Sequence, residues 1–184
     1  MTDDARRYPI GRPPAEPRLT SGERARAIAG IARLPALVRA AADRLPPEMW
    51  DVPYRPGGWT ARQVVHHLAD SHVNFYVRLR LALTEDGPVV RPYREAAWAE
   101  LPDARDGTPH DSVDLLDALH RRIIALLNAL PETDFAREIF HPEHGRNQSI
   151  DELLGAYAWH GRHHLAHLEL VAASGARPAP DDPR

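Results

Sequence analysis

The residues best suited to chemistry are histidines, and seven of the eleven lie in two short segments. The segment HGRHHLAH at 160–167 contains two pairs with a spacing of four, His160 with His164 and His163 with His167. On a helix, side chains at this spacing share a face and lie roughly 5–6 Å apart at Cβ, so two imidazoles can reach one metal ion. Taken alone, such a pair is as compatible with a structural role as with metal binding.

The apolar residues around the two pairs favour the first. One helical face, read at a 3-4 spacing, carries Leu153, Tyr157, His160, His164 and Leu168. The two leucines mark this face as the buried one, because the apolar stripe of a bundle helix points inward. We therefore predict that His160 and His164 point into the protein, with His163 at the edge of the same face.

A further ligand is available in VVHHLADSH at 64–72, which contains His66, His67 and His72. His67 shares a helical face with Val64, Leu68, Ser71 and Phe75 and should point inward. His66 precedes Asp70 by four residues, a spacing that suits a carboxylate–imidazole pair on the flank of the helix.

These spacings predict a metal site made of His67, His160 and His164. Three histidines from two helices leave one coordination position open to water or substrate, which is typical of catalytic rather than structural zinc. Imidazole nitrogen suits zinc, nickel, copper and iron alike, so the ligand type does not fix the metal.

The composition excludes several other kinds of site. The 184 residues (20.6 kDa) fit one domain, and the net charge of −3 gives no reason to expect binding to nucleic acid or to a membrane. The absence of cysteine excludes disulfides, thiolate ligands and a cysteine nucleophile. No apolar stretch approaches the roughly 20 residues of a membrane span, and MTDDARRYPIGRPP has no apolar core of a secretory signal. We expect a soluble cytoplasmic protein.

Four helical segments separated by proline-rich connections predict an all-α four-helix bundle. The helices are expected at 21–45, at 60–83, from 111 or 112 onward, and at 149–175. Thr60 with Gln63 and Ser149 with Glu152 have the spacing of capping boxes. Pro35 should kink or split the first helix.

The remaining segments are expected to be irregular. Residues 87–110 should form a proline-rich connection, and 135–140 are a candidate short strand. The domain is expected to span 21–175, preceded by an extended segment at 1–20 and followed by a flexible tail at 176–184.

The other histidines fit ordinary structural roles. A single histidine on an apolar face or on the surface is more often structural than a ligand, and this applies to His110, His120, His141 and His144. Glu138 and His141 have the Glu-x-x-His spacing of di-iron bundles, but they lie outside the expected helices and have no second copy. No HExxH, GxSxG or phosphate-binding glycine loop is present.

Several stretches resemble a known family. They are RYPIGR at 7–12, PYRPGGWTARQVVHHLADSH at 53–72, RLRLALTED at 78–86 and YAWHGRHHLAH at 157–167. With them the sequence resembles the DinB-like bundle proteins, and among these the YfiT-type metal-dependent hydrolases, also described as bacillithiol S-transferases. The resemblance implies an up-down-down-up four-helix bundle and a homodimer. It also implies one divalent ion, zinc or nickel, on His67, His160 and His164.

The open metal position indicates three possible functions. A water or thiol bound to such an ion loses its proton more readily and becomes a nucleophile near neutral pH. The first hypothesis is a metal-dependent S-transferase that joins a low-molecular-weight thiol, bacillithiol by resemblance, to an electrophilic substrate. The second is a metal-dependent hydrolase, and the third is a non-catalytic, metal-stabilised protein of the stress response.

Residues near the ligands are candidates for supporting roles. His66, Asp70, His163 and His167 are candidates for orienting the ligands or shuttling protons. Arg78 follows on the face of His67 and is a candidate for binding an anionic group of the thiol, although a surface ion pair explains it equally well. Trp59 and Trp159 are expected to be packing residues, with Trp159 a candidate for lining the pocket.

Overall fold

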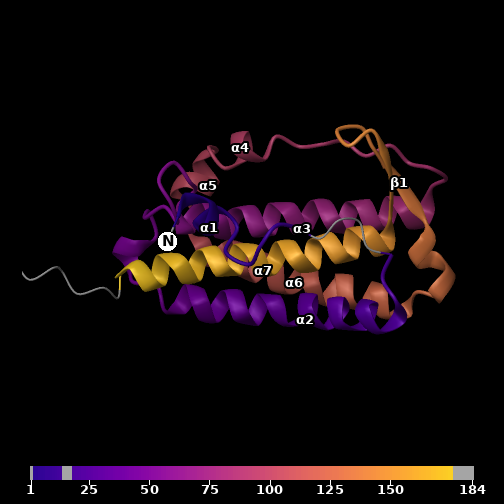
Figure 1. The fold of residues 1–184 in the computed structure, drawn as a ribbon, viewed down its shortest axis with the longest axis horizontal. Coiled ribbons are helices and arrows are strands. Elements are labelled where there is room, and N and C mark those ends of the chain that lie inside the picture. Colours follow the sequence, from indigo (N-terminus) through magenta and orange to yellow (C-terminus); the bar gives the residue numbers. More distant parts are fainter. Residues whose placement is uncertain (1, 14–17, 176–184) are drawn as a thin grey trace, which may run out of the picture.

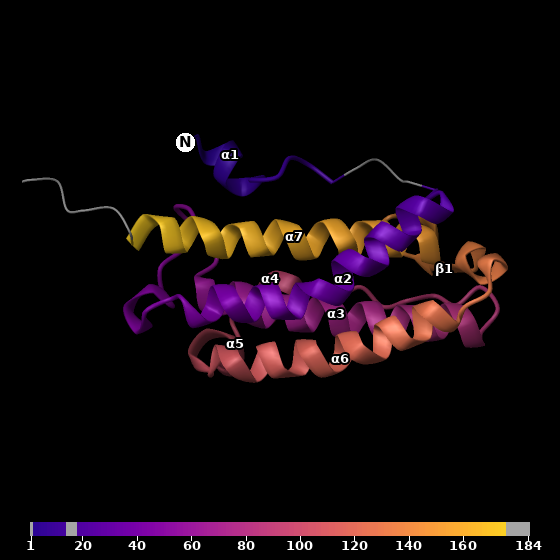
Figure 2. The same ribbon diagram turned by 90° about the horizontal axis from the view of Figure 1, so that it is seen from below.

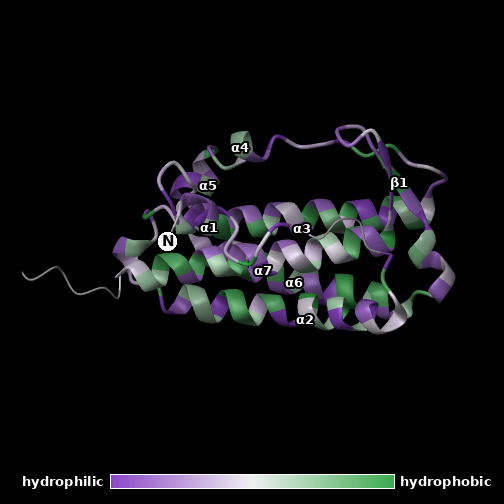
Figure 3. Cartoon of the chain, viewed as in Figure 1, coloured by the Kyte–Doolittle hydropathy of each residue, from purple (hydrophilic) through white to green (hydrophobic). Residues whose placement is uncertain are grey.

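Four long helices form most of the protein in the computed structural model, which describes residues 2–13 and 18–175. They are α2 (Ser21–Asp43), α3 (Ala61–Thr84), α6 (Pro109–Ala129) and α7 (Ile150–Gly175). In Figure 3, apolar and hydrophilic residues alternate along each of them, as expected for helices that bury one face. No helix of the described residues is both long and apolar enough to cross a membrane.

Local side-chain chemistry sets where three of these helices begin. The two predicted capping boxes are confirmed: Gln63 N donates to Thr60 Oγ1, and Thr60 N donates to Gln63 Oε1. Ser149 and Glu152 make the same reciprocal pair at the start of α7. Thr20 caps α2 in the same way. Each box satisfies two backbone N–H groups that would otherwise lack a partner at the end of a helix.

Two predictions about the helices involve prolines: the predicted start of α6 is corrected, and of the kink or split expected at Pro35 the split does not occur. α6 begins at Pro109, earlier than the predicted residue 111 or 112, because the fixed φ of proline and its missing N–H suit the first position of a helix. Pro35 does not split α2, which is continuous from Ser21 to Asp43. Figure 2 shows α2 bending along its length, so the helix accommodates a proline without ending.

The helices have the predicted up-down-down-up topology (Figure 1). α2 and α7 run in one direction, and α3 and α6 run in the opposite direction. α2 and α3 each pack against both α6 and α7, so the two pairs α2/α3 and α6/α7 lie on the diagonals. Because α3 and α6 are parallel, a long crossover at 85–108 must return the chain along the bundle, and it lies beside α3.

The connections contain more regular structure than the sequence predicted. The crossover, expected to be irregular, contains the short helices α4 (Glu95–Trp98) and α5 (Pro102–Asp106). The predicted strand at 135–140 is partly wrong, because η2 (Glu132–Ala136) occupies its first part. The observed strand β1 (Glu138–His141) pairs antiparallel with β2 (Arg146–Ser149), which the sequence analysis missed. A further 3-10 turn, η1 (Pro47–Met49), lies between α2 and α3.

Backbone hydrogen bonds join the crossover to this hairpin. Val90 N donates to Phe140 O at 3.1 Å, and Phe140 N donates to Pro88 O at 2.8 Å. The two connections therefore form one wall beside α3 and α7 at the end of the bundle where α7 begins (Figure 1).

The N-terminal segment was predicted to be extended, but part of it is helical. Residues Asp3–Arg7 form the short helix α1, capped by Thr2 Oγ1, which accepts a hydrogen bond from Ala5 N. Figure 2 shows α1 beside α7. The predicted flexible tail at 176–184 lies outside the described residues.

The buried residues form two apolar clusters separated by a polar layer. One cluster includes Phe75 on α3 and Tyr157 on α7, and the other includes Leu68 on α3 and Leu168 on α7. Between these residues α3 contains His72, and α7 contains His160, His163, His164 and His167; His72 and His167 are at most 1% exposed, and His67 lies directly before Leu68. The fold therefore places imidazoles in the middle of the bundle, with hydrophobic packing on both sides.

Candidate metal centre

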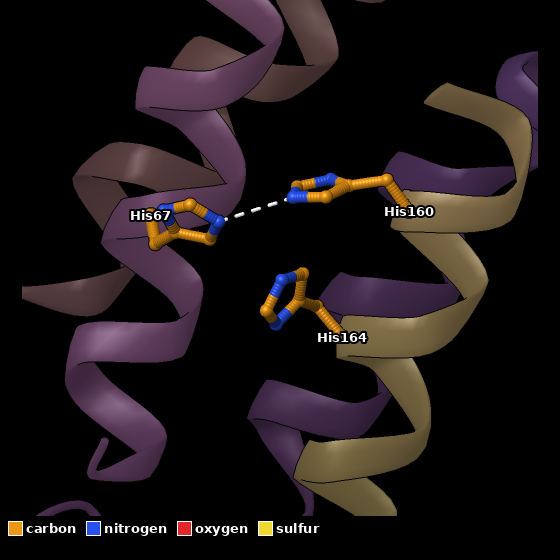
Figure 4. Close-up of side chains that lie close together, drawn as sticks. All are labelled: His67, His160 and His164. Atoms are coloured by element: carbon orange, nitrogen blue, oxygen red, sulfur yellow. Dashed lines mark hydrogen bonds between the residues drawn. The ribbon is translucent and has the colours of Figure 1, made fainter. Parts of the chain in front are cut away.

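Three histidines converge in the polar layer. His67 projects from α3, whereas His160 and His164 lie one turn apart on α7, and the three rings point toward one another (Figure 4). One ring nitrogen from each residue lies within 4.8 Å of the other two, and His67 Nε2 is 3.1 Å from His160 Nε2. The structure thus brings together the three residues that helical spacing selected.

This donor set fits a divalent transition-metal ion. Two nitrogens that ligate one ion tetrahedrally at about 2.0–2.1 Å lie about 3.4 Å apart, close to the observed separation of His67 Nε2 and His160 Nε2. Burial, followed by the neighbouring histidines, lowers the pKa of His67 to about 3 and holds the pKa values of His160 and His164 well below their usual range. Neutral rings keep a nitrogen lone pair available for a metal.

Aromatic and aliphatic contacts hold the rings in place. The Trp59 ring lies 4.5 Å from the His67 ring and 6.2 Å from the His164 ring, measured between centroids. Between the two α7 histidines, Gly161 lets α7 approach α2 closely, since a Cβ there would lie 2.3 Å from Leu34 Cδ2. Tight packing on both sides restricts the rotamers of the candidate ligands.

A pocket of about 420 Å³ opens beside the cluster, and His160 forms part of its lining. Its walls come from α3, α7, the crossover and the β-hairpin, which explains why the long crossover matters for the site. Arg78 Nη1 donates to Tyr157 OH at 3.2 Å within this pocket, and Trp159 also lines it, as proposed from the sequence. A small molecule in this pocket would therefore contact His160, one of the three clustered histidines.

Charged groups of both signs line the pocket. Arg78 lies there together with Glu95 and Glu143. Burial and the nearby Glu143 raise the pKa of Glu95, whereas Arg78 opposes this shift. A pocket with this lining suits a polar ligand that carries charged groups.

Two histidines of the pocket were missed by sequence reasoning. His141 and His144 had been assigned ordinary structural or surface roles, yet both line the pocket, and their rings stack with centroids 4.2 Å apart. His141 is 3% exposed, and its Nδ1 has no hydrogen-bond partner among the described residues. Their position in the pocket depends on the hairpin folding back over α7, which the spacing of residues in the sequence does not predict.

His120 and His110 have the structural roles that were predicted. His120 is 2% exposed, with Nδ1 donating to Ile31 O at 2.8 Å and Nε2 lying 2.9 Å from His72 Nδ1. His110 pairs with Asp43 at the surface, at 3.1 Å.

The predicted supporting residues separate into two groups. His66 does not pair with Asp70 as its spacing suggested, because its Nδ1 lies 2.8 Å from Ser112 Oγ on α6. Burial raises the pKa of Asp70 to about 6, with Asp103 contributing, and no hydrogen bond of the described residues joins Asp70 to the three rings. His163 and His167 do lie at the cluster, each with its ring beside that of His164.

A four-helix bundle with a largely buried three-histidine cluster beside a polar pocket defines the class of protein. Residues 30–168 match the model of the DinB superfamily, and the chain belongs to this family. The resemblance inferred from the sequence motifs is thereby confirmed.

Two relatives are similar to this chain over nearly its whole length. A Bacillus subtilis protein named "Putative metal-dependent hydrolase YfiT" is 42% identical over 168 residues, which are 91% of this chain and 94% of the relative. A protein of Oceanobacillus iheyensis, also named a putative metal-dependent hydrolase, is 47% identical over 163 residues, 88% of this chain and 93% of its own.

The solved structure of YfiT from Bacillus subtilis has the same fold. It superimposes with a TM-score of 0.89 at 41% identity and covers 93% of this chain and 98% of that one. It is described as "a probable metal-dependent hydrolase with an unusual four-helix bundle topology". The relatives thus carry names that agree with a metal-dependent function.

Proposed function

We propose that this protein is a metal-dependent S-transferase that binds one divalent ion, zinc or nickel, on His67, His160 and His164. The observation that carries the proposal is the convergence of three neutral ring nitrogens beside a pocket with charged walls. Three protein ligands leave a coordination position for a substrate atom, which distinguishes a catalytic from a structural site.

An ion held by these rings would lower the pKa of a thiol or water that binds to it, which supplies a nucleophile near neutral pH. The residues around it bind and orient the reactants. Arg78, hydrogen-bonded to Tyr157, would bind an anionic group of the substrate, and Glu95 and Glu143, which line the same pocket, would bind a cationic one. Trp59 packs beside the rings of His67 and His164 and would limit the access of bulk water to an ion held there.

The transfer joins a thiol RSH to an electrophile R′X. A new S–C bond forms as the C–X bond breaks, X leaves with the bonding electron pair, and the thiol proton passes to solvent. The sulfur must come from a substrate, because the chain contains no cysteine. Bacillithiol is the thiol suggested by the resemblance to YfiT-type proteins.

Hydrolysis is the second candidate, favoured by the names of the relatives. In that case the nucleophile is water, and the same pocket binds an ester or amide. The two reactions need the same ion and the same three histidines, and they differ in whether turnover depends on an added thiol.

The test is an activity assay on protein loaded with zinc or nickel. The wild type is incubated with bacillithiol or cysteine and monobromobimane, and separately with p-nitrophenyl acetate without thiol. His160→Ala removes a proposed ligand, and His66→Ala is the matched control, since His66 is a buried histidine directed at Ser112 instead. We expect His160→Ala to lower the rate more than about 100-fold. Even the loss of a residue that only hydrogen-bonds to a metal ligand lowers metal affinity or activity by about 10- to 100-fold.

Each outcome decides between the candidates. Conjugation that requires thiol and metal and is lost only in His160→Ala supports the transferase. Turnover of the ester without thiol, with the same dependence on His160, supports the hydrolase. Metal-loaded protein that does neither over a broad panel overturns both and leaves the non-catalytic, metal-stabilised protein.

We also propose that the chain forms a homodimer, an expectation that rests on the family resemblance. Light scattering on the purified protein measures the molar mass directly. A mass near that of one chain, 20.6 kDa, contradicts the proposal.

A further inference from the structure

A chain of hydrogen bonds connects the cluster to the N-terminal segment. His164 Nδ1 lies 3.3 Å from His167 Nδ1, and His167 Nε2 lies 3.3 Å from the backbone carbonyl oxygen of Arg7. We propose that His167 is a positioning residue, which together with this carbonyl holds His164 in the tautomer that presents Nε2 to the metal. The inference rests on the proposed metal centre.

The direction of each hydrogen bond follows from the carbonyl oxygen of Arg7, which is the last group in the series. A carbonyl oxygen only accepts, so His167 Nε2 must carry the proton that is shared with Arg7 O. His167 is 1% exposed, and no carboxylate of the described residues is hydrogen-bonded to it, so the ring is neutral and carries only this one proton. His167 Nδ1 is therefore a bare acceptor.

The same reasoning fixes the tautomer of His164. Because His167 Nδ1 accepts, His164 Nδ1 must donate, which leaves the lone pair of a neutral His164 on Nε2. His67 and His160 also face each other through Nε2. A metal-ligating histidine usually donates its second ring N–H to a fixed acceptor, which orients the ring and makes the ligand nitrogen more basic.

The acceptor His167 is itself held firmly. Its ring stacks on Tyr54 with centroids 3.8 Å apart and planes inclined by 14°. Arg7 is the last residue of α1, and an ion pair of Asp3 with Arg55 at 3.8 Å joins α1 to the connection that precedes α3. A segment distant in sequence from the ligands thus supplies the last hydrogen-bond acceptor of the chain.

A second ion is the main alternative for these residues. His163, His164 and His167 also bring ring nitrogens within 4.8 Å of one another. A neutral imidazole has only one nitrogen lone pair, so His164 cannot ligate an ion on each side without losing a second proton. The positioning role requires no such deprotonation, and His167 Nε2 already has its acceptor.

Two readouts test the proposal. The first is the metal affinity and stoichiometry of wild type, His167→Ala, His167→Gln and His163→Ala, measured by competition with a chelator for zinc. We expect about a 10- to 100-fold loss of affinity in His167→Ala, as is usual for groups that orient a ligand. His167→Gln should retain most of the affinity, since its amide can accept from His164 and donate to Arg7. His163→Ala should bind nearly as well as wild type.

The second readout uses metal-free protein and therefore does not depend on the proposed function. The ¹⁵N chemical shifts of the His164 ring should report a proton on Nδ1 in wild type and in His167→Gln, and a mixture of tautomers in His167→Ala. A wild-type protein that binds no zinc but shows this tautomer would refute the proposed function and leave the hydrogen-bonded chain intact.

Three results overturn the positioning role. The first is a proton on His164 Nε2 in the metal-free wild type. The second is unchanged zinc affinity in a His167→Ala protein whose circular dichroism shows that it is folded. The third is binding of two ions per wild-type chain, one of which is lost in both His163→Ala and His167→Ala, which would assign these residues to a second metal site.

Discussion

Two groups of buried or partly buried histidines lie in the same bundle, and burial and lowered pKa values are common to both. One is the candidate centre of His67, His160 and His164, and the other is the pair His72 and His120. Burial is the main cause of a lowered pKa in both groups, to about 3 for His67 and about 4 for His120. Depressed basicity therefore does not distinguish a metal site from a structural histidine.

The partners of the ring nitrogens do distinguish them. His120 uses one nitrogen on the carbonyl oxygen of Ile31 and the other on His72, so both of its nitrogens are satisfied by the protein; His72 Nε2 has no hydrogen-bond partner among the described residues, but it converges with no other ring nitrogens. At the candidate centre, three ring nitrogens converge on one point, and His160 also borders a pocket. Convergence and access, more than burial, indicate which histidines bind a ligand.

The largest expected effect concerns metal content. His67→Ala removes one of three converging nitrogens and should reduce bound metal from roughly one ion per chain to near zero, because two remaining histidines are a weak site. His72→Ala, equally buried, should retain the metal. Inductively coupled plasma mass spectrometry on tag-free protein measures both, and metal that persists in His67→Ala would refute the assignment of the ligands.

The second expected effect is a loss of stability at low pH in the metal-free protein. Unfolded histidines have a pKa near 6.5, whereas His120 and His167 titrate near 4 in the folded state and His67 near 3. The unfolded chain therefore binds more protons below pH 6.5, so stability is present above this pH and is lost as the pH falls toward 4. Each such ring contributes up to about 1.4 kcal/mol per pH unit.

Urea unfolding of chelator-treated protein between pH 7.5 and 4.5 measures this slope. The double variant His72→Phe/His120→Leu lacks both histidines of the structural pair, so its unfolding free energy should depend less steeply on pH. A wild-type stability that stays level from pH 6.5 to 5 would show that the buried rings do not titrate as their environment implies.

A smaller effect is expected from breaking the structural pair. His120→Leu leaves the Nδ1–H of His72 without its acceptor and Ile31 O without its donor in the core, which costs about 1–3 kcal/mol of unfolding free energy for each unpaired group. Metal content should not change. In the double variant His72→Phe/His120→Leu the unpaired N–H of His72 is gone and only Ile31 O lacks its former donor, so part of the loss should be recovered. Metal loss in His120→Leu would mean that the pair supports the centre after all.

The sequence predicted the parts of this comparison that depend on local spacing. The face shared by Leu153, His160, His164 and Leu168 is a property of one helix, and so are the capping boxes. These predictions need only a period of 3.6 residues and the chemistry of helix ends. The predicted ligand set itself awaits the measurement of metal content.

Features that join distant segments were not predictable in this way. The contact of His120 with His72 depends on how α3 and α6 align, and the contact of His167 with Arg7 depends on where α1 docks. His141 reaches the pocket only because the hairpin folds over α7 and binds the crossover. Propensity and periodicity describe single elements and carry no information on such alignments.

The smallest expected effect comes from His66, the neighbour of a proposed ligand. Adjacent residues on a helix point about 100° apart, and His66 is directed to Ser112 on α6 while His67 faces α7. His66→Ala loses this one hydrogen bond and should lower the unfolding free energy by about 1 kcal/mol, with metal content unchanged. Urea unfolding and metal analysis of the same sample test both parts. Loss of metal in His66→Ala, as is expected for His67→Ala, would contradict this prediction. The orientation of α3 would then not explain why His67 binds metal and His66 does not.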